Sequence, residues 1–276
     1  GIRMSAAPFV RLGLAALTLL GVATAVAAPA PIEQPAPPAW EAKLLVDYTP
    51  TPMPSVRRML ELAQAGPDDH VIDLGSGDGR ILITAAREFG VRSAVGVEID
   101  PWLVQWARSK AMEAGVADRV RFVQADLFET DFANADVVTM YLLPSLNLKL
   151  RPYLLNRLSP GTRVVSHTFD MGDWVPDARD KLYGHDIFMW VVPARVAGAW
   201  NVELNRDGPP LVLRLTQEFQ YIEASASVGG KPVQVEEARL RGDRIHFRIG
   251  EDTFEGRVEG GIIRSTGTLP WFATRQ

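Results

Sequence analysis

A glycine-rich loop with two acidic residues is the part of this sequence best suited to hold a ligand. Residues 71–80 read VIDLGSGDGR, an apolar run followed by an acid and three glycines at alternate positions. Side chains in place of Gly75, Gly77 and Gly79 would block a ligand that approaches the main chain, or would force unfavourable dihedral angles. The loop is therefore predicted to hold a ligand against its main-chain amides.

The charges on this loop indicate which ligand it holds. A dinucleotide-binding loop has the spacing G-x-G-x-x-G and carries a pyrophosphate, whereas the spacing here is G-x-G-x-G. Asp73 and Asp78 repel a diphosphate but attract a ligand that carries an ammonium group and a sulfonium. These residues favour S-adenosylmethionine over a nicotinamide dinucleotide.

Two more acids lie at the ends of the next two predicted strands: Glu98 closes the second strand and Asp126 follows the third. A nucleoside needs an acceptor for its ribose hydroxyls and a polar contact at the adenine edge, and both are expected at the carboxyl ends of successive strands. Glu98 ends an apolar run, so we expect its carboxylate to reach the ribose. Ile99, the next residue, is a candidate to pack on the adenine face.

The elements around the loop alternate between short strands and longer helices. The predicted strands are residues 70–74, 93–99, 120–124, 136–141 and 162–168, and the predicted helices are residues 56–65, 80–89, 101–114 and 146–158. This alternation, with short loops, predicts an α/β domain over residues 41–193, with a doubly wound, mostly parallel, Rossmann-like sheet.

The pattern changes near residue 194. Apolar and polar residues alternate at 211–216 and 244–249, which is typical of half-buried strands. Paired glycines and Asp-Gly steps at intervals of roughly 10 to 20 residues predict tight turns. Residues 194–276 are therefore predicted to form a small antiparallel all-β domain, a meander or barrel of five to seven strands without helices.

The first forty residues are predicted to lie outside the fold. Residues 12–28 are apolar and uncharged, follow Arg3 and Arg11, and end in small residues, so residues 1–28 are typical of a secretory signal peptide. An uncleaved membrane anchor is the alternative, with membrane association through this segment. Because the positive charges come first, both alternatives place the rest of the chain outside the cytoplasm. Residues 29–40 form a Pro-rich linker.

The composition excludes several classes of protein and site. The 276 residues contain no Cys, so thiolate metal sites, disulfides and Cys nucleophiles are excluded. The formal net charge is -4 and no long basic run is present, which argues against nucleic acid as a partner. With 47% hydrophobic and 22% charged residues, the chain has the composition of a globular protein.

The runs VIDLGSGDGR, VGVEIDP and FVQADLFETDF resemble those of class I S-adenosylmethionine-dependent methyltransferases. The motif LGSGDGR is similar to that of the non-SET protein-lysine methyltransferases and of the mitochondrial family that methylates a lysine of an ATP-synthase subunit. Pro101 and Trp102 also match the mitochondrial family, in which a Pro-Trp pair follows the ribose acid. The resemblance covers roughly residues 48–174.

The resemblance implies S-adenosylmethionine as the cofactor and assigns contacts to it. It places Asp73 and the backbone of Gly75 and Gly77 at the methionine part, Glu98 at the ribose and Asp126 at the adenine. The neighbouring Ser76 and Leu127 are included in the predicted cofactor site. In the resembling families a segment before the first helix folds over the cofactor as a lid, which makes Tyr48 and Thr51 candidates; an ordinary proline-bounded loop is the alternative.

The acceptor side is less well defined by the sequence. Many amine methyltransferases carry Asn/Asp-Pro-Pro-Tyr after the fourth strand, whereas this chain has Tyr141-Leu142-Leu143-Pro144 and lacks the side-chain amide. Tyr141 is therefore the best acceptor-side candidate, with simple packing as the alternative. Trp174 ends an aromatic segment similar to one in the lysine families and is predicted to line the acceptor channel.

Methyl transfer requires alignment and desolvation more than a strong base, and an aromatic-lined channel favours a neutral lysine acceptor. We therefore predict a protein-lysine methyltransferase. Small-molecule O- or N-methylation remains an alternative, either with His167 and Asp170 as a catalytic pair or with these two and Asp136 as ligands of a divalent metal. A third hypothesis is a non-catalytic protein that binds the cofactor and acts through its β domain.

Overall fold

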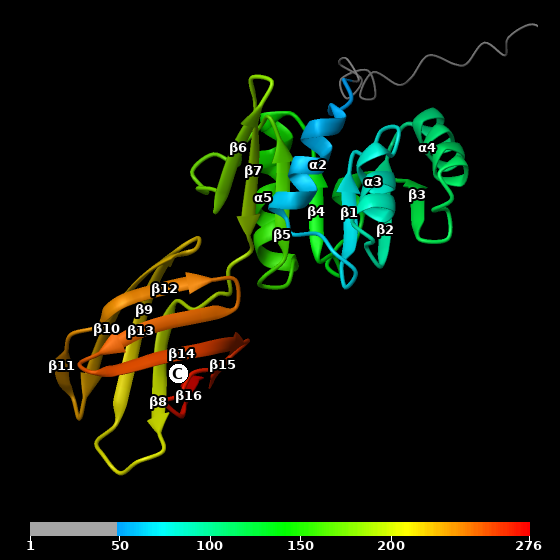
Figure 1. The fold of residues 1–276 in the computed structure, drawn as a ribbon. Helices are drawn as coiled ribbons and strands as arrows, with labels where there is room; N and C mark the ends of the chain where they lie inside the picture. The colour runs from blue at the N-terminus through cyan, green and yellow to red at the C-terminus, as the bar shows by residue number, and fades with distance from the viewer. Residues whose placement is uncertain (1–48) are drawn as a thin grey trace, which may run out of the picture. The chain divides into compact units, whose positions relative to one another are not determined.

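The computed structural model describes residues 49–276, which belong to one compact unit. Two β-sheets and four α-helices make up this part of the chain (Figure 1). The predicted signal peptide or anchor, the Pro-rich linker and Tyr48 lie outside the described residues. No helix among residues 49–276 is long and apolar enough to cross a membrane.

The first sheet, sheet A, has seven strands in the order β3-β2-β1-β4-β5-β7-β6. Its strands are β1 (His70–Leu74), β2 (Ser93–Glu98), β3 (Val120–Gln124), β4 (Val137–Met140), β5 (Arg163–His167), β6 (Ala178–Leu182) and β7 (His185–Val191). Strands β1 to β5 are parallel, and β7 pairs antiparallel with both β5 and β6. The strand order reverses at β1, between β2 and β4, and ligands bind at such switch points in open α/β sheets.

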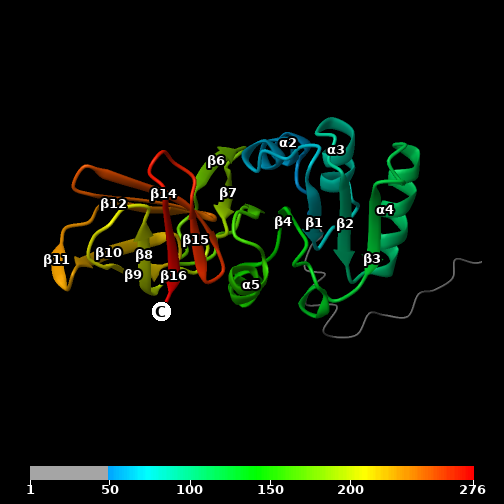
Figure 2. The same ribbon diagram turned by 90° about the horizontal axis from the view of Figure 1, so that it is seen from below.

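Helices cover both faces of sheet A. They are α2 (Met53–Leu62), α3 (Arg80–Glu88), α4 (Pro101–Glu113) and α5 (Pro144–Arg157). Helices α2, α3 and α4 pack on one face around Leu60, Leu82 and Ala107, and α5 packs on the other through Leu150 and Leu154 (Figure 2). Proline lies in the first turn of α2, α4 and α5, where its missing N–H has no helical partner to lose.

The second sheet, sheet B, is entirely antiparallel. Its strands are β8 (Gly198–Leu204), β9 (Leu211–Glu218), β10 (Tyr221–Val228), β11 (Lys231–Val233), β12 (Glu236–Arg241), β13 (Arg244–Ile249), β14 (Asp252–Glu259), β15 (Ile262–Ser265) and β16 (Trp271–Arg275). Strand β16 pairs with β8, and β10 lies close to β12, so the meander curls toward a barrel. Its interior is filled by aromatic rings, including Trp200, Phe247, Phe254 and Trp271.

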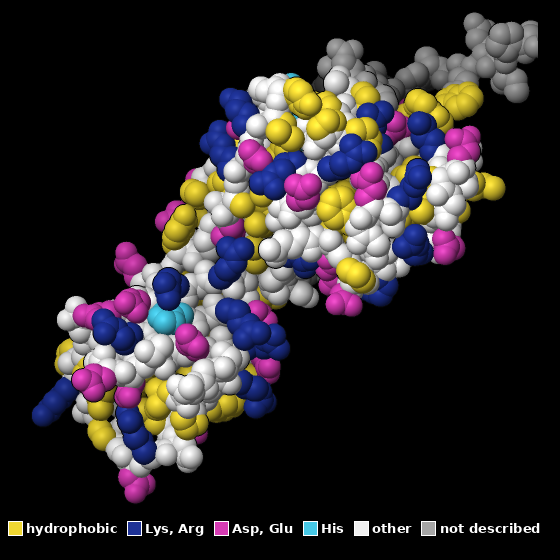
Figure 3. Space-filling model, in the orientation of Figure 1, with side chains coloured by type: hydrophobic (Ala, Val, Ile, Leu, Met, Phe, Trp, Pro, Cys, Tyr) yellow, Lys and Arg dark blue, Asp and Glu magenta, His cyan; other side chains and the backbone are white. Residues whose placement is uncertain are grey.

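The outer surface of sheet B carries charges of both signs. Figure 3 shows Lys and Arg side by side with Asp and Glu on the face in view. Ion pairs such as Arg206 with Asp252 and Arg264 with Glu259 join neighbouring segments on this sheet. Such mixed, exposed pairs keep a sheet soluble and add little to its stability.

The predicted fold class is confirmed, with a mostly parallel α/β sheet followed by an antiparallel all-β sheet. Two details differ. Sheet B has nine strands instead of five to seven, because short strands such as β11 and β15 carry too few residues for a clear alternation. Strands β6 and β7, which extend sheet A beyond β5, were not among the predicted strands.

Candidate functional site

The glycine loop folds over the carboxyl end of β2. The amides of Gly75 and Ser76 donate to the carbonyl oxygen of Val97 at 2.8 and 3.1 Å. Gly75 and Gly77 have φ values of +80° and +54°, which side-chain-bearing residues adopt only at a cost. The loop thus needs glycine for its backbone conformation, as the sequence predicts.

The third glycine, Gly79, also allows close packing of the core. A Cβ on Gly79 would lie 2.5 Å from Cζ of Phe122 and 3.1 Å from the side chain of Ala107. Gly79 therefore allows the start of α3 to pack closely against β3 and α4. Gly79 also has a φ of +81°, so the predicted unfavourable dihedral angle for a side chain here is confirmed, and such a side chain would in addition collide with the core.

Glu98 turns its carboxylate toward the glycine loop. Its Oε1 accepts the amide of Gly77 at 3.0 Å, and its Oε2 accepts the amide of Asp100 at 3.0 Å. Burial raises the pKa of Glu98, and these backbone donors oppose the rise. The carboxylate is therefore fixed beside the loop from the end of β2, where a ribose contact is predicted.

Asp73 is buried at the carboxyl half of β1, beside Thr139 of β4. Burial raises the pKa of Asp73 to about 8, and the charges of Glu98 and Asp78 add to the rise. The hydroxyl oxygens of Ser76 and Thr139 are also buried and have no protein partner among the described residues. Two hydroxyls beside the glycine loop and β1 therefore lack protein hydrogen-bond partners.

The predicted adenine-side residues lie at the ends of β2 and β3. The amide of Ala125 donates to the carbonyl of Glu98 at 3.1 Å, which brings the two strand ends together. Asp126 is exposed, and its carboxylate accepts the amide of Phe128 at 2.9 Å as the cap of the short 3-10 helix Leu127–Glu129. Ile99 and Leu127 are half-buried. The adenine contacts stay a prediction.

A second cluster lies at the carboxyl ends of β4 and β5. The ring of Tyr141 meets His167 edge-on with centroids 4.5 Å apart and stacks with Phe169 at 6.1 Å. Oγ1 of Thr51 lies 3.4 Å from Nδ1 of His167, and the carbonyl of Thr51 accepts a hydrogen bond from Arg80 at 3.2 Å. The segment before α2 therefore contacts both Arg80, at the end of the glycine loop, and His167, which packs against Tyr141. A lid role for Thr51 stays a prediction.

His167 is 2% exposed, and its Nε2 has no partner among the described residues. Burial lowers the pKa of His167 to about 4, and the nearby His185 adds to the effect. The imidazole is therefore neutral at physiological pH. The next residue, Thr168, has a φ of +71°, an unusual conformation for a β-branched residue.

Trp174, the other predicted acceptor-side residue, is completely buried. Its ring lies 5.7 Å from that of Trp190 in β7 and stacks at 6.1 Å with Phe219, at the turn between β9 and β10. Its carbonyl accepts the indole N–H of Trp190 at 2.7 Å. These contacts favour a packing role, and the predicted place in an acceptor channel stays untested.

The metal alternative does not fit the strand directions. Asp136 precedes β4, where it accepts the amide of His70 at 2.7 Å, while His167 and Asp170 lie at the opposite, carboxyl end of the sheet. A four-residue strand separates these ends by about 13 Å, too far for one metal ion. No group of three or more His, Asp or Glu among residues 49–276 is arranged to hold a metal.

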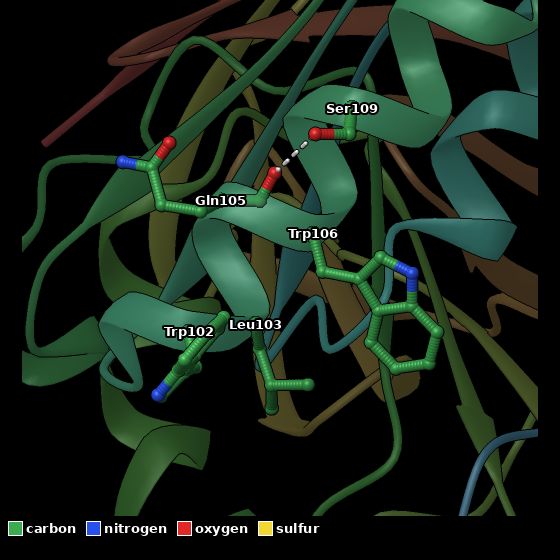
Figure 4. A pocket seen from close by; sticks show the side chains of 5 residues that line it. All are labelled: Trp102, Leu103, Gln105, Trp106 and Ser109. Atoms are coloured by element: carbon green, nitrogen blue, oxygen red, sulfur yellow. Dashed lines mark hydrogen bonds between the residues drawn. The ribbon is translucent and has the colours of Figure 1, made fainter. Parts of the chain in front are cut away.

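A shallow hollow of about 450 Å³ lies on the outer face of α4. Its lining comes from this helix alone: Trp102, Leu103, Gln105, Trp106 and Ser109 (Figure 4). The side chain of Trp102 is 62% exposed. The hollow includes none of the predicted site residues.

Sequence reasoning missed three polar or aromatic residues of the site. Thr139 is a hydroxyl within the otherwise apolar strand β4, and Phe169 follows the β5 end. Asn147 is buried in α5, and its amide donates to the carbonyls of Phe169 and Asp170 at 3.2 and 3.0 Å. A polar residue at an apolar position was the available signal for Thr139 and Asn147.

Comparison with known proteins identifies the family. Residues 73–178 match the ANTKMT methyltransferase domain. A protein-lysine N-methyltransferase from Saccharolobus islandicus is 46% identical over 151 residues, which make up 53% of this chain and 94% of that protein. The chain belongs to the methyltransferase family that contains this archaeal protein.

Two animal relatives match this methyltransferase over only part of their own length. A lysine N-methyltransferase from Xenopus laevis, named for an ATP synthase subunit, is 36% identical over 49% of this chain and 58% of its own length. An adenine nucleotide translocase lysine N-methyltransferase from Mus musculus is 35% identical over 52% of this chain and 65% of its own. The methyltransferase therefore spans less than two thirds of these two proteins.

A solved structure supports the cofactor of this methyltransferase. An RNA methyltransferase from Salinibacter ruber, in complex with S-adenosyl-L-homocysteine, is 58% identical with a TM-score of 0.53, covering 54% of this chain and 96% of that chain. The predicted family resemblance, enzyme class and cofactor are confirmed: the protein is an S-adenosylmethionine-dependent methyltransferase.

The residues of this methyltransferase fit S-adenosylmethionine. The loop at Gly75 and Gly77 bears no side chain, and the unpartnered hydroxyls of Ser76 and Thr139 lie with Asp73 at the ends of β1 and β4. A buried acid with a raised pKa gains most from a cationic ligand, because the positive charge favours its ionised form. Asp73, Ser76, Gly77 and Glu98 are the residues that would hold the cofactor.

Proposed function

We propose that this methyltransferase transfers methyl groups to the side-chain nitrogen of lysine in a protein. The observation that carries the proposal is the 46% identity to a protein-lysine N-methyltransferase over 94% of that protein's length. Two further relatives named as lysine N-methyltransferases match about half of the chain. The neutral, aromatic character of the cluster around Tyr141 supports an amine acceptor.

When bound, S-adenosylmethionine supplies an electrophilic methyl group on a positively charged sulfur. The chain's own residues bind and orient it. Glu98 is fixed by the amides of Gly77 and Asp100, and the positive charge of the bound ammonium group favours the ionised form of the Asp73 carboxyl. The protein mainly aligns the reactants and excludes water. No residue of the loop has to transfer a proton.

The acceptor must be deprotonated before it reacts. A lysine ammonium that enters a buried, aromatic environment loses hydration, which lowers its pKa toward the physiological range. The Tyr141 hydroxyl is one hydrogen-bond partner for the amine, and the unpartnered Nε2 of neutral His167 is a second. Neither group carries a positive charge that would repel the incoming ammonium.

The test is methyl transfer by the purified protein. Tritiated S-adenosylmethionine is supplied with a pool of lysine-containing peptides, with transfer RNA, and with catechol plus magnesium as three separate acceptors. We expect label on the peptides, at lysine by mass spectrometry. Label on RNA alone, the acceptor class named for the Salinibacter ruber protein, would contradict the proposal, as would label on catechol alone. Cofactor binding without transfer to any acceptor would favour a non-catalytic protein.

The control variant is Gly77→Asp. Gly77 has a φ of +54°, and its amide donates to Glu98, so the substitution strains the loop and sets a second carboxylate against Glu98. We expect it to abolish cofactor binding and label transfer together. Transfer that persists in this variant would show that a contaminating enzyme does the work.

We also propose that the catalytic unit works outside the cytoplasm, exported or held at a membrane by residues 12–28. The support is the position of Arg3 and Arg11 before the apolar run. Fusion of alkaline phosphatase after residue 276 tests the side of the membrane, and we expect an active phosphatase. An inactive phosphatase at normal expression would place the unit in the cytoplasm, where the cofactor is made.

A further inference from the structure

The turn between β9 and β10 is an unusual hairpin. Glu218 pairs with Tyr221, so Phe219 and Gln220 form a two-residue loop. Phe219 has a φ of +53°, a conformation for which hairpin loops prefer Asn, Asp or Gly. A large aromatic residue there is disfavoured by the backbone, which indicates that its ring is held by contacts outside sheet B.

Those contacts are with the segment that follows β5, residues 168–177, here called the acceptor segment. Phe219 stacks on Trp174 with an interplanar angle of 18°. The side-chain amide of Gln220 donates to the carbonyl of Val175 at 2.7 Å. Gln220 is 9% exposed and is the one residue of sheet B or its turns among the buried polar side chains of residues 49–276.

The same segment is held from the other side by α5. Arg151 donates to the carbonyl of Met171 at 2.9 Å and to the carboxylate of Asp173 at 2.5 Å, and its guanidinium lies 5.4 Å above the ring of Phe219. Asn147, one turn earlier, holds the carbonyl of Phe169 at 3.2 Å. Since Phe169 stacks on Tyr141, a continuous set of contacts joins the turn of sheet B to the cluster at the end of β4.

Sheet B is an addition to the family core. The match to the Saccharolobus islandicus relative covers 94% of that protein but only 53% of this chain. The match to the family model lies at residues 73–178. A match of 151 residues that contains this region cannot also contain all of sheet B. The archaeal protein therefore has no complete counterpart of this sheet in its matched region.

We propose that Phe219 and Gln220 are positioning residues: the turn of sheet B fixes the acceptor segment, and through Phe169 it sets the place of Tyr141 for the methyl acceptor. The cofactor residues lie at the ends of β1 and β2 and take no part in these contacts. The turn thus acts on the acceptor and leaves the cofactor site unchanged. Its effect on an amine acceptor rests on the proposed lysine activity; its effect on the segment does not.

The test uses the full chain with Phe219→Asn. Asn suits the left-handed backbone, so the hairpin forms while the ring that stacks on Trp174 is lost. We expect amide hydrogen exchange in residues 169–175 to rise by about tenfold or more. With the lysine peptide pool, we expect the KM for peptide to rise several-fold, while the affinity for S-adenosylhomocysteine by calorimetry changes by less than about twofold.

Three further variants complete the test. Gln220→Ala removes the bond to Val175 and should reproduce the rise in exchange, and Phe219→Tyr should restore the wild-type values. The matched control is Phe272→Ala, which removes a ring covered by an arginine at 5.6 Å, as Phe219 is by Arg151, but on β16. It should leave exchange in the acceptor segment unchanged.

Two results would overturn the proposal. Exchange in residues 169–175 that stays at the wild-type level in Phe219→Asn would show that α5 alone fixes the segment. A loss of S-adenosylhomocysteine affinity parallel to the change in exchange would show a general loosening of the fold. If the wild-type protein does not methylate the peptides, the proposed function fails, and the exchange experiment still decides the role of the turn.

Discussion

The two sheets treat buried polar groups in opposite ways. Among residues 49–276, the buried polar side chains are Thr51, Ser55, Asp69, His70, Asp73, Ser76, Asp78, Thr84, Thr139, Asn147, Thr162, Ser166, His167 and Gln220. All but Gln220 belong to sheet A and its helices and loops. The core of sheet B is filled by apolar and aromatic side chains, and its charges pair on the surface.

The difference shows which part is built for stability and which for binding. Burying a polar group costs free energy unless it is hydrogen-bonded. Among residues 49–276, seven buried side-chain atoms have no partner: five belong to sheet A with its helices and loops, and two, Oε1 of Gln220 and Nε of Arg248, belong to sheet B. Of the five in sheet A, those of Ser76, Thr139 and His167 belong to the predicted cofactor and acceptor clusters, where a ligand can complete their hydrogen bonds. Gln220, the exception in sheet B, touches the acceptor segment, which is consistent with the proposed role of its turn.

The largest effect is expected at two glycines, one in each sheet, where an added Cβ would clash with its neighbours. A Cβ on Gly96 would lie 2.5 Å from Phe122 and 2.6 Å from Oγ of Ser76, and a Cβ on Gly256 would lie 2.7 Å from both Ile263 and Trp271. We expect Gly96→Ala and Gly256→Ala each to lose about 1–3 kcal/mol of unfolding free energy in urea. Only Gly96→Ala should also lose S-adenosylhomocysteine binding, by about a hundredfold, because it displaces the loop at Ser76. Equal S-adenosylhomocysteine affinity in both variants would contradict the assignment of ligand binding to sheet A alone.

Acid unfolding tests the buried imidazole. The pKa of His167 is lowered from 6.5 to about 4 in the fold, so between these values the unfolded chain binds the extra proton and stability rises with pH. Above about pH 6.5 the stabilising difference is complete, and it is lost as the pH falls toward 4. From about pH 6 to pH 4.5 the wild type should lose about 2 kcal/mol more unfolding free energy than His167→Gln. Parallel curves for the two proteins would mean that His167 is solvated.

Cofactor affinity should depend on pH through Asp73. The pKa of its carboxyl is raised to about 8 by burial, so below pH 8 it is mostly protonated and must lose a proton to meet a cationic ligand. We expect S-adenosylhomocysteine to bind about tenfold more tightly at pH 7 than at pH 6 by calorimetry. Asp73→Asn should bind more weakly and without this dependence. A pH-independent wild type would place the ammonium away from Asp73.

The smallest effect is expected on the outer face of α4. Trp102 is 62% exposed, and the hollow around it contains no predicted site residue. Trp102→Gln should change the unfolding free energy by less than about 0.5 kcal/mol and leave S-adenosylhomocysteine affinity unaltered. A clear loss of affinity would extend the cofactor site along this helix.

Local sequence patterns predicted the parallel strands of sheet A well and its antiparallel strands β6 and β7 poorly. Strands β1 and β3 have the predicted bounds, since each is a compact run between clear turn residues. Helix α5 begins at Pro144, two residues before its predicted start, because proline at the first position carries no periodic signal. Strand β6, ARDKL, is a charged edge strand and lacks the β-branched residues by which strands are recognised.

Site residues at the ends of parallel strands were likewise easier to predict than those on loops. Asp73 and Glu98 could be placed from sequence because parallel strands bring their carboxyl ends to one edge. The cluster of Thr51, Tyr141 and Phe169 depends on how three separate loops fold back, which no local pattern encodes. The contact between Phe219 and Trp174 joins residues 45 positions apart, across two sheets, and is visible only in the structure.

The left-handed backbone of Thr168 limits how this enzyme can be improved. A Thr with a φ of +71° sits between His167 and Phe169, where Gly or Asn would relax the chain. Selection for heat resistance alone would therefore favour replacing Thr168. The relaxed loop would hold the imidazole and the phenyl ring less firmly, so thermotolerant descendants chosen without a catalytic screen would turn over slowly.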